Sequence, residues 1–81
     1  MSTELYAAEI ADCTEVIRIN PNDAVAYFNR GWAYFSRDTC SDEAIADYTE
    51  AIRIDPDYAE AYYNRGFVYG GQSKYAEAIA D

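Results

Sequence analysis

Acidic residues recur in pairs along this sequence, and paired carboxylates are the side chains best suited here to act as a general acid and a general base. The pairs are Asp12/Glu15, Asp42/Glu43 and Asp47/Glu50. Acid–base catalysis would need such a pair in a desolvated pocket where its pKa values are shifted. Their helical spacing instead places most of these carboxylates opposite an apolar stripe. We therefore interpret them as a water-facing row.

The other residue types that could support chemistry lack the partners that the chemistry needs. The chain has no His, so neither Cys13 nor Cys40 has an imidazole base to activate it. Asp55-Pro56-Asp57 lacks the ligand series of a calcium loop. Gly70-Gly71 has no following Lys-Ser/Thr with which to hold a phosphate. The sequence predicts no catalytic residue, no metal site and no cofactor.

Charge and hydrophobicity narrow the class of partner. Fifteen acidic and six basic residues give a net charge of −9, which repels phosphate backbones and argues against nucleic acid. No apolar run approaches the ~20 residues of a membrane span. Two Cys without a secretory signal favour a reducing, cytoplasmic setting over a disulfide framework.

Helical periodicity organises the elements that would carry these residues. Apolar residues recur at intervals of three and four, and Asn20-Pro21 and Asp55-Pro56 interrupt the pattern. A turn is expected at 70–73, where two glycines precede Gln and Ser. The helices expected are 1–21, 24–37, 42–54, 59–69 and a fifth that begins at Tyr75.

These helices repeat. The segment IADCTEVIRINP at 10–21 matches IADYTEAIRIDP at 45–56, and AYFNRGWAY at 26–34 matches AYYNRGFVY at 61–69. Pro21 and Pro56 lie 35 positions apart, as do Gly31 and Gly66. Because both glycines fall inside helices, where Gly costs about 0.8–1.0 kcal/mol relative to Ala, we expect each to mark a close helix contact. The period and the helix-turn-helix content indicate a helical solenoid.

The landmarks resemble the tetratricopeptide repeat. In one repeat its seven characteristic places are filled by Tyr27, Gly31, Tyr34, Ala44, Tyr48, Ala51 and Pro56; in the next, four are filled by Tyr62, Gly66, Tyr69 and Ala78. The resemblance implies an all-α fold of antiparallel helix-turn-helix repeats stacked as a short right-handed solenoid. Its parts would be the second helix of an incomplete repeat (1–23), a complete repeat (24–58) and a repeat truncated in its second helix (59–81).

The chain departs from the family pattern at five points. Cys13 and Val16 replace an aromatic residue and an alanine, so the first helix should pack more loosely than the others. Arg30 and Arg65 precede the glycines, where the family often has an aliphatic residue. We expect each arginine to lay its stem over apolar neighbours while its head reaches water or a carboxylate, with anion binding as the alternative. A residue inserted near Cys40 is expected only to lengthen a turn.

The resemblance also implies a concave groove that binds a peptide or a partner helix. Its groove positions map onto Val25, Phe28, Asn29, Trp32, Phe35, Glu60, Tyr63, Asn64, Phe67 and Gly70. We predict a non-catalytic interaction module for an apolar or aromatic-anchored segment, with Asn29 and Asn64 binding its backbone. Phe28 and Phe67 can equally belong to the packing between repeats. The pattern leaves the identity of the protein or peptide partner open.

A different interpretation comes from the ends of the chain. Tyr6–Asp12 nearly duplicates Tyr75–Asp81, so the first helix of one molecule could dock where another molecule's last segment lies. The chain would then be a self-associating structural element, or a fragment of a longer scaffold.

Overall fold

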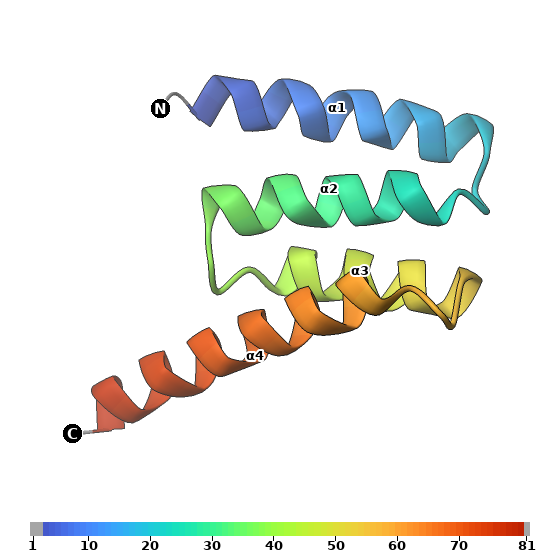
Figure 1. Cartoon of the computed structure of the whole chain (residues 1–81). Helices are drawn as coiled ribbons and strands as arrows, with labels where there is room; N and C mark the ends of the chain where they lie inside the picture. The colour runs from blue at the N-terminus through green and yellow to red at the C-terminus, as the bar shows by residue number, and fades with distance from the viewer. Residues whose placement is uncertain (1–2, 81) are drawn as a thin grey trace.

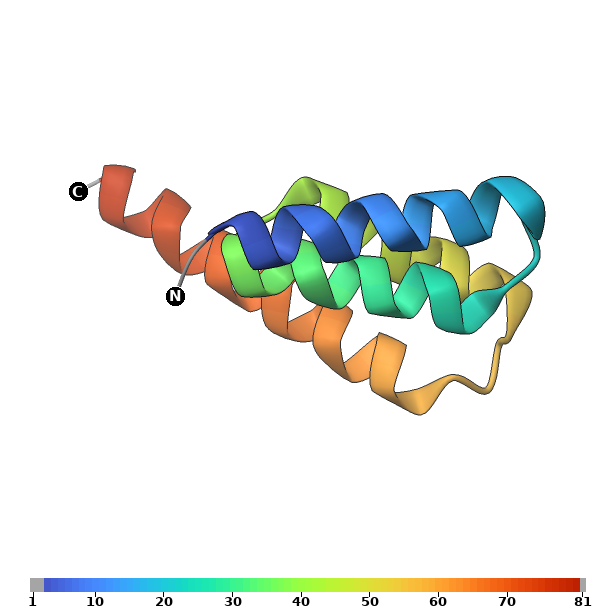
Figure 2. The same cartoon turned by 90° about the horizontal axis from the view of Figure 1, so that it is seen from above.

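The computed structural model describes the backbone of residues 3–80 and the side chains of residues 4–74. It contains four helices, each antiparallel to and packed on the next (Figure 1). They are α1 (Thr3–Ile19), α2 (Ala24–Arg37), α3 (Asp42–Ile54) and α4 (Ala59–Ala80). They follow one another in chain order (Figure 1), and from above α2 and α4 lie toward one side of the stack and α1 and α3 toward the other (Figure 2). The prediction of an all-α, antiparallel repeat array is confirmed.

Side-chain caps fix where α2 and α3 begin. The carboxylate of Asp23 accepts a hydrogen bond from the Ala26 N–H at 3.1 Å. The hydroxyl of Ser41 accepts one from the Ala44 N–H at the same distance. Each cap satisfies a backbone donor that the first helical turn leaves without a partner. Both helices therefore have the bounds that the sequence predicts.

The core is built mainly from small residues. Five residues of α3 and α4 are fully buried and form one cluster, and they are Ala44, Tyr48, Ala51, Ala61 and Val68. The alanines let the helix backbones approach closely, and Tyr48 is the only aromatic ring among the five. By contrast, no described side chain of α1 is fully buried. Because α1 packs mainly against α2, this exposure does not measure the tightness of its packing, and the looser packing expected for α1 stays a prediction.

The close contact predicted at Gly31 is present. A Cβ at this position would lie 2.9 Å from Cε1 of Tyr48, closer than packed atoms tolerate. At Gly66 the same prediction is wrong, because no described atom lies within 4 Å of an added Cβ. The two glycines share a register but not an environment.

The cause lies in the course of α4. The predicted turn at 70–73 does not form, nor does a separate fifth helix: α4 continues through both glycines to Ala80 and extends beyond the other helices (Figure 1). Its Gln72 amide donates to the Cys40 carbonyl at 2.9 Å and to the Asp42 carboxylate at 2.7 Å. A seven-residue helix starting at Tyr75 could not offset the cost of a turn with its own backbone hydrogen bonds. The assignment of residues 1–23, 24–58 and 59–81 to successive repeats stays a prediction.

Candidate protein-binding surface

Four aromatic side chains form a continuous row across α2 and α4. The Trp32 and Phe35 ring centroids are 5.6 Å apart, and Phe35 meets Phe67 edge-on at 5.9 Å. Phe67 in turn contacts Tyr63 at 6.5 Å. These are the separations at which aromatic rings attract one another. We call this row, Trp32, Phe35, Tyr63 and Phe67, the aromatic surface.

Helical spacing and the repeat period bring the four rings together. Trp32 and Phe35 lie one turn apart on α2, and Tyr63 and Phe67 lie one turn apart on α4. Trp32 and Phe67 occupy the same place in successive repeats, 35 positions apart. Because α3 holds α2 and α4 in register, equivalent positions on these two helices contribute to one surface.

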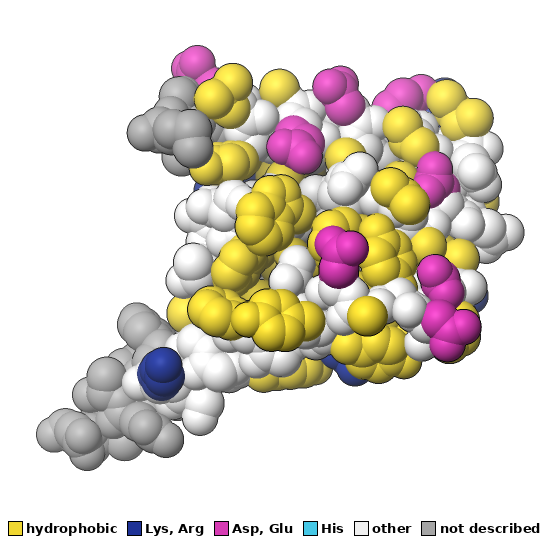
Figure 3. All heavy atoms as spheres, in the orientation of Figure 1, with side chains coloured by type: hydrophobic (Ala, Val, Ile, Leu, Met, Phe, Trp, Pro, Cys, Tyr) yellow, Lys and Arg dark blue, Asp and Glu magenta, His cyan; other side chains and the backbone are white. Residues whose placement is uncertain are grey.

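The aromatic surface faces water. Trp32 is 47% exposed, Phe67 60% and Tyr63 72%, whereas Phe35 is half-buried beneath them. Hydrophobic side chains gather over α2 and α4 in this orientation, with acidic side chains around them (Figure 3). Around the described residues the surface encloses no pocket, so this face is open rather than a cavity. Contiguous exposed aromatic area of this kind is typical of interaction sites.

Phe28 belongs to the packing between helices. Its ring stacks on Tyr58 at 4.9 Å and contacts Tyr48 at 5.6 Å, and the side chain is half-buried against the core. Phe67, for which the sequence left the same two alternatives, is on the surface instead. The first helical turns contribute Val25, Asn29 and Glu60, all of which are exposed.

Asn64 lies closer to the core than Asn29. It is half-buried near the hydroxyl of Tyr48. Burial raises the pKa of the Tyr48 phenol to about 12, although the nearby amide acts in the opposite direction. No described residue lies at a distance and angle suitable for a hydrogen bond to the Tyr48 hydroxyl. The amide of Asn64 is thus turned partly toward this buried oxygen, while Asn29 is available to a ligand.

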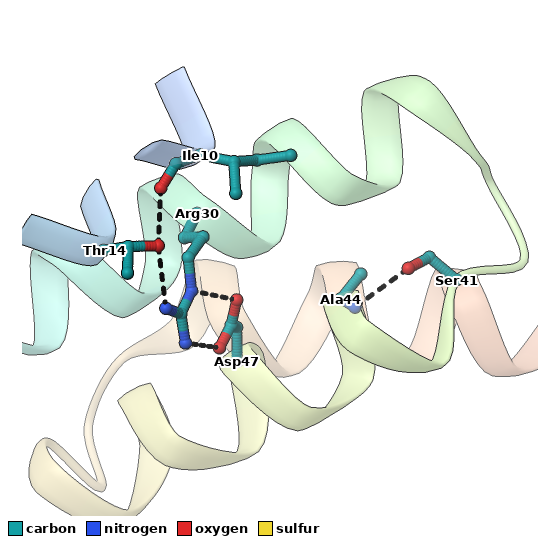
Figure 4. A network of polar contacts seen from close by, with 6 residues as sticks. All are labelled: Ile10, Thr14, Arg30, Ser41, Ala44 and Asp47. Carbon is teal, nitrogen blue, oxygen red and sulfur yellow. Dashed lines mark hydrogen bonds and ion pairs between the residues drawn. The ribbon is translucent and has the colours of Figure 1, made fainter. Parts of the chain in front are cut away.

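Arg30 joins three helices through one guanidinium group. Its Nε and Nη2 donate to the two carboxylate oxygens of Asp47, both at 2.8 Å, and Nη1 donates to the Thr14 hydroxyl at 3.1 Å (Figure 4). The Thr14 hydroxyl donates to the Ile10 carbonyl at 2.6 Å. The hydrogen bonds with Asp47 raise the pKa of the Arg30 guanidinium. The guanidinium is therefore occupied by this carboxylate.

Asp47 corrects the interpretation of the acidic pairs as a water-facing row. Its side chain is 7% exposed, because α3 turns it toward Arg30 on α2. A carboxylate is tolerated at such a position only with a paired cation. Sequence reasoning foresaw a carboxylate partner for Arg30 but did not identify Asp47. The signal that could have found it is that all three residue types recur at the 35-residue period, as Thr14 and Thr49, Arg30 and Arg65, and Asp12 and Asp47.

The remaining acidic pairs behave as surface groups. Glu15 pairs with Arg18 at 2.5 Å and Glu50 with Arg53 at 2.5 Å, each across one helical turn. The hydrogen bond from Arg18 lowers the pKa of the Glu15 carboxyl. Such exposed pairs contribute little to stability. Within residues 4–74, none of these exposed pairs lies in a desolvated pocket.

Cys13 and Cys40 are both free thiols, but they lie in different environments. Cys13 is half-buried on α1, and this desolvation, with Glu9 nearby, raises the pKa of its thiol. Cys40 lies in the turn that contacts α4, where its carbonyl binds Gln72. That turn is therefore part of the packing, and the expectation that its inserted residue only lengthens it is wrong. Among the side chains the structure describes, no three potential metal ligands come together.

Comparison with known protein families gives two matches. Residues 13–46 match the family described as tetratricopeptide repeat, and residues 41–73 match the family described as TPR repeat. The two matches overlap in α3 and together span most of the four helices. Searches of curated proteins and of solved structures returned no significant match. No helix within residues 3–80 is both long enough and apolar enough to cross a bilayer.

Proposed function

This chain belongs to the tetratricopeptide-repeat family, and we propose that it binds an extended or helical protein segment on its aromatic surface. Repeats of this family generally mediate protein–protein interaction. The observation that supports this site is the row of mutually contacting, exposed rings from two successive repeats. Aromatic residues dominate the energetics of protein interfaces because they bury large areas with few rotatable bonds.

The proposed ligand has an apolar or aromatic anchor and carries basic residues. The anchor would cover Trp32 and Phe67, and Asn29 at the edge offers an amide to the ligand's backbone. Glu60 is exposed one turn before Tyr63 on α4, where it can pair with a Lys or Arg of the segment. The net charge of −9 favours such a segment over an acidic one. Specificity would come from anchor spacing, since the surface encloses no pocket.

Trp32 is also the reporter for the test, because it is the only Trp in the chain. A peptide selected from a random display library for binding to the 81-residue chain is titrated while Trp32 emission is recorded. Burial of the exposed indole should shift this emission to the blue. Phe67→Ala should weaken the affinity about thirtyfold, the effect of a hot-spot residue worth ~2 kcal/mol. Trp32→Ala removes the reporter itself, so its affinity is measured by calorimetry, and it should fall by about the same factor.

Tyr69→Ala is the matched control. Tyr69 is 51% exposed on the same helix as Phe67 but lies about 200° around it. Its removal should leave the affinity unchanged, and far-ultraviolet circular dichroism should show full helicity for every variant. An unchanged affinity in Trp32→Ala and Phe67→Ala would contradict the proposed site.

A further inference from the structure

A second face of α4 lacks the helix that covers its counterpart on α2. Tyr62 and Tyr69 are 45% and 51% exposed, and between them Gly66 has no described atom within 4 Å of an added Cβ. The equivalent face of α2 is covered by α3, which places Tyr48 against Gly31. We call Tyr62, Gly66 and Tyr69 the open face of α4.

The guanidinium beside this face has no described carboxylate partner, unlike its counterpart. Arg30 binds Thr14 on the helix before it and Asp47 on the helix after it. Arg65 makes the first of these contacts, donating to the Thr49 hydroxyl at 3.2 Å. No carboxylate of residues 4–74 pairs with it. Its guanidinium lies over the Tyr62 ring of the open face, 5.6 Å from the ring centroid, as that of Arg30 lies over Tyr27.

Helix α1 has a carboxylate at the repeat position of Asp47. Residues 10–21 repeat residues 45–56, so Asp12 of α1 corresponds to Asp47 of α3. Asp12 is exposed and forms no ion pair with any described residue. Among the described residues, Arg65 on α4 thus has no carboxylate partner, and Asp12 on α1, at the other end of the molecule, has no cationic partner.

The shape of α1 fits the open face as well. Cys13 corresponds to Tyr48, the residue that packs on Gly31, and Val16 corresponds to the fully buried Ala51. Val16 is 43% exposed, although an apolar side chain at that register is covered in the complete repeat. The side of α1 that corresponds to the covered side of α3 therefore faces water.

We propose that α1 of a second copy of this chain docks on the open face of α4. In this contact Asp12 of the second copy accepts hydrogen bonds from Arg65, and its Cys13 packs over Gly66. The contact repeats the way in which α3 packs on α2 within one chain. It is head-to-tail, so each added copy leaves one α1 and one α4 free, and assembly is open-ended.

Two features make this association weaker than the contact it imitates. Cys13 is smaller than Tyr48 and leaves part of the open face in contact with water, which reduces the apolar area removed from solvent. Each copy also carries a net charge of −9, so copies repel one another unless salt screens them. The assemblies should therefore form reversibly, at high concentration and moderate ionic strength.

The test is analytical ultracentrifugation of the 81-residue chain over a wide concentration series at moderate salt. The wild type should show an average mass that rises continuously with concentration. Arg65→Asp should lower the association constant at least about tenfold, because it places a carboxylate opposite Asp12. Asp12→Arg should do the same by placing a cation opposite Arg65.

Mixing the two variants makes the test specific. In the mixture, the arginine introduced by Asp12→Arg meets the aspartate introduced by Arg65→Asp. The native Asp12 of the second variant meets the native Arg65 of the first, as in the wild type. The mixture should therefore assemble although neither variant assembles alone. Recovery in the mixture would also show that both variants are folded, so the loss of assembly in each variant alone could not be ascribed to unfolding.

Three results would overturn the proposal. The first is a wild type that stays monomeric at the highest concentration. The second is assembly that Trp32→Ala abolishes and Arg65→Asp does not, which would place the contact on the aromatic surface. The third is a mixture that stays monomeric. The first and third would leave the peptide-binding proposal untouched, because that site lies on another face of α4.

Discussion

Gly31 and Gly66 show how much of a residue's role depends on what packs against it. Both lie inside helices at the same repeat position, yet a Cβ would lie 2.9 Å from Tyr48 at the first and meet no described atom at the second. The energetic consequence of adding a methyl group therefore has opposite signs at the two positions.

Gly31→Ala should destabilise the fold by about 1–3 kcal/mol, because Tyr48 must leave its packed position. Gly66→Ala should stabilise the monomer by up to about 1 kcal/mol, since Ala is the better helix former and the site is open. Urea unfolding of dilute protein measures both. Two shifts of the same sign would show that the helix contact at Gly31 is not as tight as the structure has it.

Tyr48 has a hydroxyl that is buried without a direct hydrogen bond. Such a group contributes a desolvation cost and no compensating bond. Tyr48→Phe should therefore leave stability unchanged or raise it by up to about 1 kcal/mol at neutral pH. A clear loss, measured by the same urea titration, would mean that Asn64 or a water molecule binds this oxygen.

The same residue predicts a response to alkaline pH. The pKa of Tyr48 is raised by burial to about 12, against an ordinary value of 10.0. Above pH 10 the unfolded chain loses this proton first, so the stability is complete below pH 10 and is lost as the pH rises toward 12. Tyr48→Phe should lose less stability over this interval. Equal slopes for the two proteins would contradict the assignment.

At the scale of helices, the pair of Arg30 and Asp47 does more than the surface pairs around it. Asp47→Ala should cost about 3 kcal/mol, because it leaves a guanidinium that is 19% exposed without its carboxylate. Glu50→Ala, which removes the exposed pair with Arg53, is the control and should cost about 0.2–0.5 kcal/mol. Thermal unfolding of the two variants compares them directly, and similar losses would refute the structural importance of the buried pair.

Helices α2 and α3 were predictable from the sequence, and the end of α4 was not. Asp23 and Ser41 act through nearby backbone donors, so local sequence sets where their helices begin. The continuation of α4 past Gly70 depends instead on Gln72, which binds the turn at Cys40 from a distance of some thirty residues. Asp47 was misjudged for the same reason, because its partner lies on a different helix. These contacts join different helices, so the apolar period within any one helix does not show them.

At the scale of the molecule, the repeat period predicted the architecture because each repeat packs only on its neighbours. The four helices make a slab whose smallest extent is 16 Å, thin enough that every helix keeps a side in water. This explains why the candidate binding surface could be mapped in outline from matched positions. It also explains why individual rings could not be assigned. Phe28 and Phe67 both lie near the boundary between packing and water, and the neighbouring rings of Tyr48 and Tyr58 place Phe28 inside.

The position of Arg30 between two helices has a consequence for how the array melts. Its guanidinium is held from both sides, so detachment of α1 removes one of the contacts that orient it toward α3. The interaction therefore adds to the coupling between neighbouring repeats rather than to the intrinsic stability of either one. In a linear array, strong coupling lengthens the stretch that opens together. One half-buried arginine per repeat, bonded to an acceptor on each neighbouring helix, would let a short chain of marginal units unfold as a single cooperative unit.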